Sequence, residues 1–186
     1  MYVRNTGSSS QLWFLSDLTG DPAKLKAAPY LETPFRTWQC QFSPGTGESP
    51  RWVAYASDES RHGTEIYVQS FPAGAGKFQV SSGGGSQPRW RRDGKELFYI
   101  APDGKLMAVD VKAPLSGRGA PSLEFGIPHA LFDSQMWNAA VNLVTFRYDV
   151  TPDGQRFLVN SARQAEAAAA PEAITVLTNW MAGSKK

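Results

Sequence analysis

The 186-residue chain contains one cysteine, Cys40, and two histidines, His62 and His129. A single cysteine excludes an intrachain disulfide and a thiolate metal cluster. Neither histidine has a second histidine or a cysteine at the spacing of a metal site, so each is interpreted as an exposed loop or edge residue. We therefore expect no bound metal and no cofactor.

An excess of one charge sign and long apolar runs are also absent. The chain has 19 basic and 17 acidic residues, a formal charge of +2, which does not indicate a nucleic-acid or anionic-membrane surface. No apolar run approaches the roughly 20 residues of a membrane span. Residues 1–7 lack the basic and apolar regions of a signal peptide, so the compartment stays open.

Assembled catalytic motifs are missing as well. The stretch 74–77, Gly-Ala-Gly-Lys, resembles a phosphate-binding loop, but Phe71 stands where that loop needs Gly. Phe78 follows the Lys in place of Ser or Thr. A Gly-x-Ser-x-Gly elbow is excluded because Pro88 ends the only near match. The sequence therefore predicts a chain that is not an enzyme.

Aromatic residues, glycine and proline are abundant. Aromatics make up 12% of the chain, with six Trp, and there are 17 Gly and 13 Pro. This composition is typical of a protein built from short β-strands. Apolar or alternating runs predict strands at 11–18, 25–31, 38–44, 51–57, 64–70, 77–81, 87–91, 96–101, 105–111, 127–132, 146–150, 155–160 and 173–180. Residues 1–10 are expected to be a flexible N-terminus, 165–170 helical or disordered, and 182–186 a tail.

The clearest hairpin spans Ser86–Ile100. Its two predicted strands are separated by Asp93-Gly94, which predicts a two-residue type I′ turn with positive φ at both positions. Asp-Gly recurs at Asp103 and Asp153. Each of these carboxylates is single, so they are interpreted as turn residues and not as calcium ligands.

The hairpin is repeated along the chain. Equivalent apolar columns are Phe42, Trp90 and Val150, then Val53, Leu97 and Phe157, then Tyr55, Tyr99 and Val159. A period of 40–45 residues with four short strands predicts a β-propeller segment of four-stranded antiparallel blades. The boundaries are a partial blade at 11–35, blades at 36–82 and 83–133, and a partial blade at 134–181. An ordinary β-sandwich is the alternative, disfavoured by the three aligned hairpins.

Several strings resemble TolB-type, WD-repeat-like propeller repeats, and most of all the C-terminal propeller of bacterial, especially acidobacterial, serine/threonine protein kinases. They are Phe42-Ser43-Pro44, residues 51–55, residues 65–68, residues 83–90 and residues 148–159, with the closing residues 174–180. The first hairpin departs from the pattern, because residues 43–50 lack the Asp-Gly turn. The kinase motifs are absent, so kinase activity does not carry over.

The resemblance implies a non-catalytic interaction or sensor module, the C-terminal part of a larger propeller protein, with a protein or peptide partner. It also implies a location outside the cytoplasmic membrane. The alternative is a regulatory fragment of an enzyme, either a serine/threonine kinase or a prolyl-oligopeptidase-like peptidase, whose catalytic domain is not in this chain.

The candidate binding residues lie on the first strands of the predicted blades, which would line a central channel. Alternation places Gln87, Arg89 and Arg91 on one strand face, opposite Trp90. Packing does not explain these polar side chains, which either recognise a peptide or small ligand or are hydrated. The full set is Gln39, Gln87, Arg89, Arg91 and Arg147.

An open stack of two full and two partial blades would leave exposed strand edges and an apolar blade face. We therefore expect the chain to associate with itself or with further blades. Light scattering of the purified chain should give a mass above that of one chain. A well-behaved monomer with a cooperative melt would contradict this expectation.

Overall fold

The computed structural model describes residues 2–6, 9–16, 20, 22–45, 51–74, 76–112, 122–136, 145–160 and 175–178. The described elements are antiparallel strands and one 3-10 turn, η1 (Pro22–Lys24), so the all-β class is confirmed. The Ala-rich piece at 165–170 and the tail at 182–186 lie outside the described residues.

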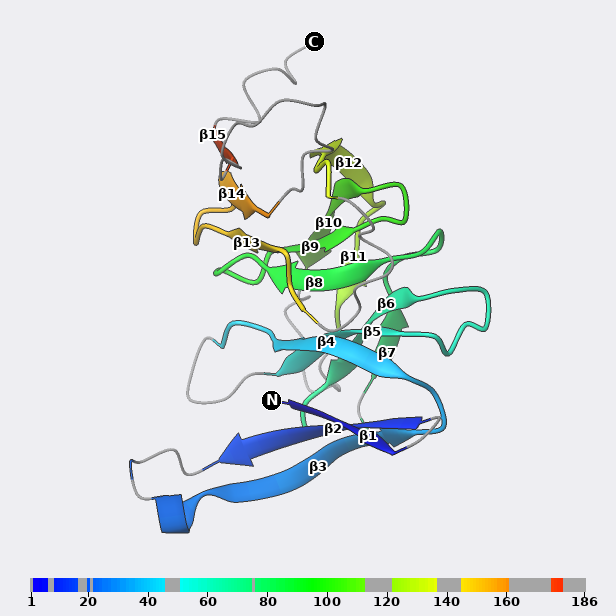
Figure 1. Ribbon diagram of the computed structural model, residues 1–186, viewed down its shortest axis with the longest axis vertical. Coiled ribbons are helices and arrows are strands. Elements are labelled where there is room, and N and C mark those ends of the chain that lie inside the picture. Colours follow the sequence, from blue (N-terminus) through cyan, green and yellow to red (C-terminus); the bar gives the residue numbers. More distant parts are fainter. Residues whose placement is uncertain are drawn as a thin grey trace, which may run out of the picture.

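The described strands form four sheets, which follow one another along the chain (Figure 1). Sheet 1 contains β1 (Tyr2–Thr6), β2 (Ser9–Ser16) and β3 (Lys26–Thr33). Sheet 2 contains β4 (Thr37–Phe42), β5 (Trp52–Ser57), β6 (Glu65–Ser70) and β7 (Lys77–Gln79). Sheet 3 contains β8 (Ser86–Trp90), β9 (Glu96–Ile100), β10 (Lys105–Lys112), β11 (Glu124–Phe125) and β12 (His129–Asp133). Sheet 4 contains β13 (Tyr148–Val150), β14 (Arg156–Val159) and β15 (Thr175–Thr178).

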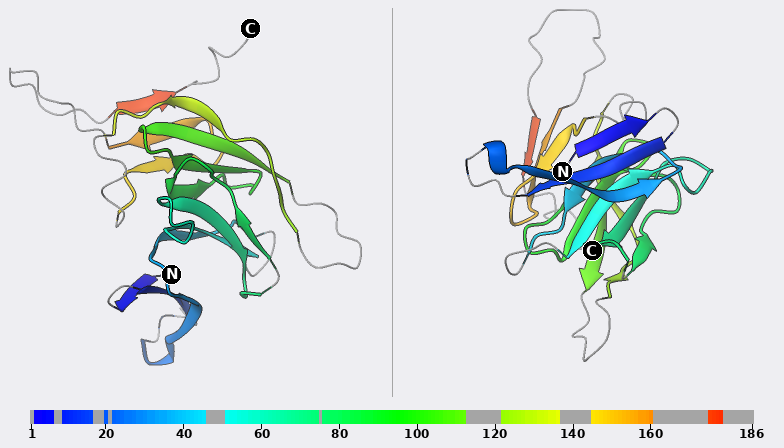
Figure 2. Two further views of the ribbon diagram at one scale, coloured as in Figure 1. Left: turned by 90° about the vertical axis from the view of Figure 1, so that its right-hand side faces the viewer. Right: turned by 90° about the horizontal axis from the view of Figure 1, so that it is seen from below.

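The sheets are stacked in chain order, with sheets 1 and 4 at opposite ends (Figures 1 and 2). Sheet 1 corrects the expectation of a flexible segment at 1–10, because β1 pairs with β2 from Tyr2↔Trp13 to Thr6↔Ser9. Backbone pairing does not require apolar side chains, and the polar residues 5–10 carry no periodic apolar signal. Sheet 1 therefore has three strands, where the sequence predicted two.

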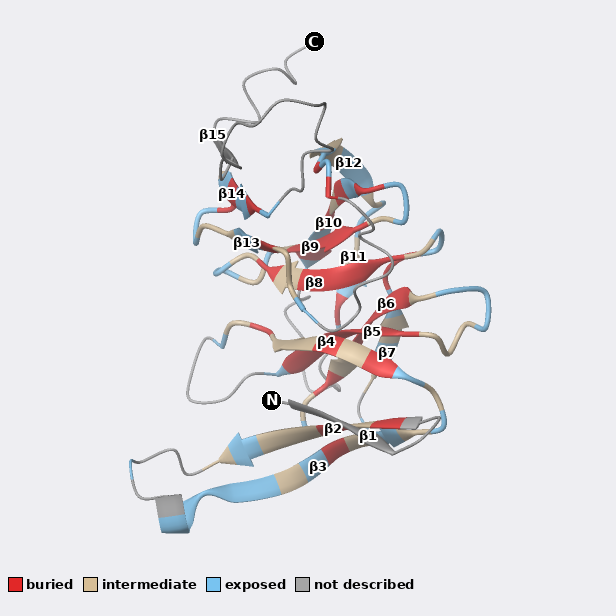
Figure 3. Ribbon diagram, in the orientation of Figure 1, coloured by how far each residue is buried: buried red, intermediate tan, exposed pale blue. Residues whose placement is uncertain are grey.

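Apolar layers lie between successive sheets. One cluster joins sheets 1 and 2 through Leu12, Tyr30 and Tyr55. A larger cluster joins sheets 2 and 3, and a further cluster joins sheets 3 and 4. The burial map shows the consequence, since buried residues concentrate in the two middle sheets (Figure 3). Each middle sheet is buried on both faces, which explains the near-continuous apolar runs of β5 and β9.

Residues that align in the sequence repeat face the same direction in successive sheets of the stack. Val53 packs in the layer toward sheet 1, Leu97 in the layer toward sheet 2, and Phe157 in the layer toward sheet 3. Each member of the column thus faces the preceding sheet. Intervening residues face the other way, as Phe98 does toward sheet 4. One side-chain alternation repeated three times therefore builds the whole core.

The turns differ from the predicted type. Only Gly94 has positive φ in the β8–β9 turn, at 72°, and its N–H donates to Arg91 O over 2.9 Å. The Asp93 carboxylate accepts the Lys95 N–H at 3.0 Å, an Asx-type bond. A loop of residues 92–95, closed by the Arg91 N–H to Glu96 O bond of 3.0 Å and containing one left-handed glycine, therefore replaces the two-residue type I′ turn. Gly154 repeats this geometry with the same φ of 72°.

The Gly83–Gly85 linker between β7 and β8 contains a position where backbone packs against side chains. A Cβ at position 85 would lie 2.7 Å from Ile66 Cγ1 and 3.0 Å from Tyr99 Cδ2, inside the layer between sheets 2 and 3. A Cβ at position 83 would meet no atom within 4 Å. Only a residue without a side chain allows the close approach at 85.

Gly85→Ala should therefore lower the free energy of unfolding by about 1–3 kcal/mol through overpacking. Gly83→Ala, two residues away in the same linker, should change it by less than about 0.5 kcal/mol. Urea denaturation of both variants tests this. Equal destabilisation by the two substitutions would contradict the packing explanation.

Candidate functional site

Two glutamines of the predicted set occupy equivalent bulges. The β4–β5 register shifts between Trp38 and Gln41, and the β8–β9 register shifts between Ser86 and Arg89. Inside these bulges Gln39 and Gln87 have φ of 50° and 58°. Left-handed backbone is uncommon for non-glycine residues. Its recurrence at two equivalent positions indicates that the bulge is part of the repeat and re-aims both side chains.

The re-aimed glutamines connect successive sheets. The Gln39 Oε1 atom accepts the Gln87 backbone N–H at 2.8 Å, which links sheet 2 to sheet 3. The Gln87 Oε1 atom accepts the Arg147 N–H at 2.6 Å, immediately before sheet 4. Gln39 Nε2 also donates to Thr145 O over 2.9 Å. The first strands of sheets 2, 3 and 4 therefore converge on one line of side chain-to-backbone hydrogen bonds.

A tyrosine completes the line. Tyr148 donates its hydroxyl to Gln87 O at 2.9 Å, and burial raises the pKa of Tyr148 well above its ordinary value. The hydroxyl thus stays protonated and donating at neutral pH. Gln87 Nε2 has no hydrogen-bond acceptor among the residues that the structure describes. The convergence line therefore contains one buried amide donor that the packing leaves unused.

The structure corrects the interpretation of the glutamines. Gln87 is fully buried and Gln39 is 5% exposed, so neither is a channel-lining residue open to solvent. Their side chains join sheets, and a binding role for them stays a prediction. The Arg147 N–H bonds to Gln87, and Gln39 bonds to the nearby Thr145 carbonyl. Ligand binding by the Arg147 side chain stays a prediction.

The two arginines of β8 and its turn share one face, opposite Trp90, as alternation predicts. The Arg89 guanidinium lies 4.0 Å from the centre of the Phe146 ring, and Arg89 Nε lies 3.8 Å from Asp149 Oδ1. Both partners belong to the segment around β13. Arg89 therefore contributes to docking sheet 4 on sheet 3, and its binding role stays a prediction.

Arg91 is occupied by its own hairpin. Its guanidinium donates to both Asp93 carboxylate oxygens, at 2.7 and 2.8 Å, and to Glu96 at 2.5 Å. The hydrogen bonds from Arg91 lower the pKa of Asp93. A Cβ on Gly154 would lie 2.7 Å from Arg91 Cδ, so the arginine stem packs directly on the next Asp-Gly turn. Arg91 therefore stabilises the turns, and its binding role stays a prediction.

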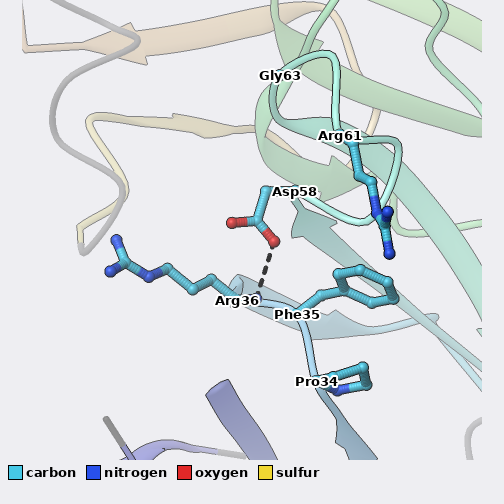
Figure 4. Close-up of a pocket in the computed structure, with 6 residues that line it drawn as sticks. All are labelled: Pro34, Phe35, Arg36, Asp58, Arg61 and Gly63. Atoms are coloured by element: carbon cyan, nitrogen blue, oxygen red, sulfur yellow. Dashed lines mark hydrogen bonds between the residues drawn. The ribbon is translucent and has the colours of Figure 1, made fainter. Parts of the chain in front are cut away.

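Hollows occur at the other end of the strands. We call this side the loop end; it is formed by residues 34–36, 58–64, 80–86 and 100–104. The turns 91–95 and 151–155 lie at the opposite ends of the strands (Figure 1). One hollow of about 360 Å³ is lined by Pro34, Phe35, Arg36, Asp58, Arg61 and Gly63. Figure 4 shows the Arg36 and Arg61 side chains extending on opposite sides of Asp58.

Asp58 organises this first hollow. Its Oδ1 atom accepts the Arg36 N–H at 2.9 Å, and its backbone carbonyl accepts the Arg61 N–H at 2.9 Å. The Arg61 guanidinium lies 6.0 Å from the centre of the Phe35 ring. With two arginines and one aspartate among its lining residues, the hollow has a net positive formal charge.

A second hollow of about 440 Å³ lies on the other side of the 58–64 loop. Its lining residues are His62, Gly63, Thr64, Glu65, Ser82, Gly83, Gly84, Gly85, Ser86, Ile100 and Pro102. Gly63 lines both hollows, so they are neighbours. The sequence reasoning missed both sites. The available signal was Glu65, a carboxylate at the start of an otherwise apolar strand, followed by a triple-glycine linker.

The remaining chemistry of the described residues is sparse. Burial raises the pKa of the Cys40 thiol to about 11, so it is protonated at neutral pH. The described part of the chain contains no group of three or more His, Cys, Asp or Glu side chains that could hold a metal ion. No helix within the described ranges is long and apolar enough to cross a membrane.

Taken together, the described residues define an all-β protein of stacked antiparallel sheets with two hollows at one end. The chain matches no protein-family model and no curated protein.

The hydrogen bond from Arg147 to Gln87 can be tested by substitution. Gln87→Ala removes the buried acceptor of the Arg147 N–H. It should lower the free energy of unfolding by about 1–3 kcal/mol more than an alanine at another left-handed position does. Gln135→Ala is the matched control, because Gln135 also has φ of 50° but is exposed. Chemical denaturation measures both, and equal losses would show that only the left-handed backbone matters.

Proposed function

We propose that this chain is a non-catalytic interaction module built from β-propeller-type blades, part of a larger propeller, that binds a peptide or protein at its loop end. The observation that carries the proposal is the line from Gln39 through Gln87 to Arg147. Propeller blades converge on a common axis at their first strands. Here the first strands β4 and β8, and the residue directly before β13, are joined by side chain-to-backbone hydrogen bonds.

The two-faced burial of the middle sheets supports the same architecture. A blade buries its faces only against neighbouring blades, so stacking is the condition for a stable repeat. Sheets 2 and 3 meet this condition on both sides. Sheets 1 and 4 meet it on one side each among the described residues.

The outer faces of the end sheets support continuation into further blades. Leu15 on β2 is 36% exposed and Leu158 on β14 is 49% exposed. Their sequence neighbours Phe14 and Phe157 point into the stack. In a longer propeller, apolar side chains at these places would be covered by the next blade.

The loop end supports the binding role. Rigid strands position the loops that form both hollows, which is how binding sites commonly arise on repeat scaffolds. One hollow holds two arginines and one aspartate, and its neighbour contains a buried carboxylate. Two differently charged hollows side by side suit a peptide with side chains of both signs.

Panning a random peptide library against the immobilised chain tests the proposal. Amide chemical shifts of the labelled protein should change in the 58–64 loop and the 82–86 linker when an enriched peptide is added. Arg61→Ala should weaken binding at least threefold, whereas Arg92→Ala, an exposed arginine at the opposite turns, should not. The proposal fails if no peptide is enriched, or if shifts map to the opposite turns.

A further inference from the structure

The Glu65 side chain is a buried carboxylate at the start of β6. The residue is 5% exposed. Its oxygens accept the Gly84 N–H at 3.0 and 3.1 Å and the Ser81 hydroxyl. Ser81 Oγ in turn accepts the Ile66 N–H at 2.8 Å. These bonds fix the carboxylate in place against the glycine linker that enters sheet 3.

All of these hydrogen-bond donors are neutral. The ion pairs found among the described residues join other side chains, and none of them includes Glu65. Burying an ionised carboxylate without a cation is costly, and hydrogen bonds only partly offset that cost. A cation that entered the hollow would therefore meet a carboxylate that none of these ion pairs uses.

Glu65 contributes to the raised pKa values of two neighbouring tyrosines. Burial, and after it the negative charge of Glu65, raises the pKa of Tyr99 to about 12. Glu65 also contributes to the raised pKa of Tyr67, after burial and Glu59. Glu65 is thus a source of negative potential within the layer between sheets 2 and 3.

The second hollow lies beside this residue. Glu65 is one of its lining residues, and its volume of about 440 Å³ exceeds that of an extended lysine side chain. Ile100 and Pro102 supply an apolar wall, and His62 stands in the exposed loop at its edge. Apolar walls around one carboxylate suit an alkyl chain that ends in an ammonium group.

We propose that the hollow between the 62–65 and 82–86 segments binds an alkylammonium group, with Glu65 as its counter-charge and Ile100 and Pro102 against its methylenes. This inference rests on the proposed binding role of the loop end and names the chemistry recognised there. In a peptide the lysine side chain supplies this group, and the free N-terminus is the competing source of an ammonium, without the methylenes.

Titration of the labelled chain with Nα-acetyl-lysine methylamide tests the proposal. The Gly84 and Gly85 amide signals should shift, with a dissociation constant of about 1 mM, as expected for one weakly held group. The Nε-acetylated analogue keeps the chain but loses the charge, and it should bind at least tenfold more weakly. Alaninamide, with only a free α-amine, distinguishes the N-terminal source: tighter binding than the lysine probe assigns the site to N-termini.

Glu65→Gln is the decisive variant, because the amide keeps an oxygen for Gly84 and can donate to Ser81 Oγ. It should weaken binding of the lysine probe at least tenfold. Glu124→Gln makes the same charge change at an exposed position of β11 and should leave binding unchanged. If Glu65→Gln unfolds, Ser82→Arg places a cation at the exposed rim and leaves Glu65 and its contacts intact. It should also abolish binding.

Equal binding of the charged and acetylated probes, or full binding by Glu65→Gln or Ser82→Arg, overturns the inference. Failure of the probes alone leaves the peptide panning result standing, so that outcome refutes the ammonium site and not the binding module. Failure of panning with the probes still bound refutes the module and not the site.

Discussion

The stack depends on buried backbone groups that cannot all pair within their own sheets. At the β8 bulge the Gln87 N–H bonds to Gln39 Oε1 of sheet 2, and Gln87 Oε1 in turn accepts the N–H of Arg147, directly before β13. Leaving such a buried N–H without an acceptor would cost about 1–3 kcal/mol. The left-handed backbone at the glutamines is the strain that this linkage requires. The relative placement of three sheets thus follows from one repeated hydrogen bond.

Apolar packing also joins the sheets, and it determines which neighbouring sheet each strand face contacts. Because Val53, Leu97 and Phe157 each face the preceding sheet, every sheet is completed by the one before it. At the strand ends, the side-chain stem of Arg91 in sheet 3 packs on the turn at Gly154 in sheet 4, which adds a further contact between these two sheets. Stability in such an array is a sum of neighbouring interfaces. The end sheets are therefore the least supported, which agrees with the exposed Leu15 and Leu158.

The loop end combines tight packing with unneutralised charge. The approach of Gly85 to Ile66 and Tyr99 draws the linker against β6, and this brings the Gly84 N–H to the Glu65 carboxylate. The same glycines that permit close packing thereby line the hollow beside it. Across the 58–64 loop, Arg36 and Arg61 line the first hollow together with Asp58. Opposite charges on adjacent hollows are a consequence of where two loops and one linker meet.

The sequence by itself determined the strands and their order, because period-2 alternation and Asp-Gly turns are local signals. It also placed Val53 with Leu97, and Gln39 with Gln87, since a repeat aligns residues without any knowledge of contacts. It missed β1, whose polar residues pair through the backbone, and it misjudged the turn at Gly94. Tertiary structure alone decided that the glutamines are buried linkers, because their bonding partners lie outside their own sheets, 48 and 60 residues further along the chain. It alone decided that Glu65 faces a hollow, because the distance from β6 to the linker at Gly84 is set by packing between sheets and not by any neighbour in sequence.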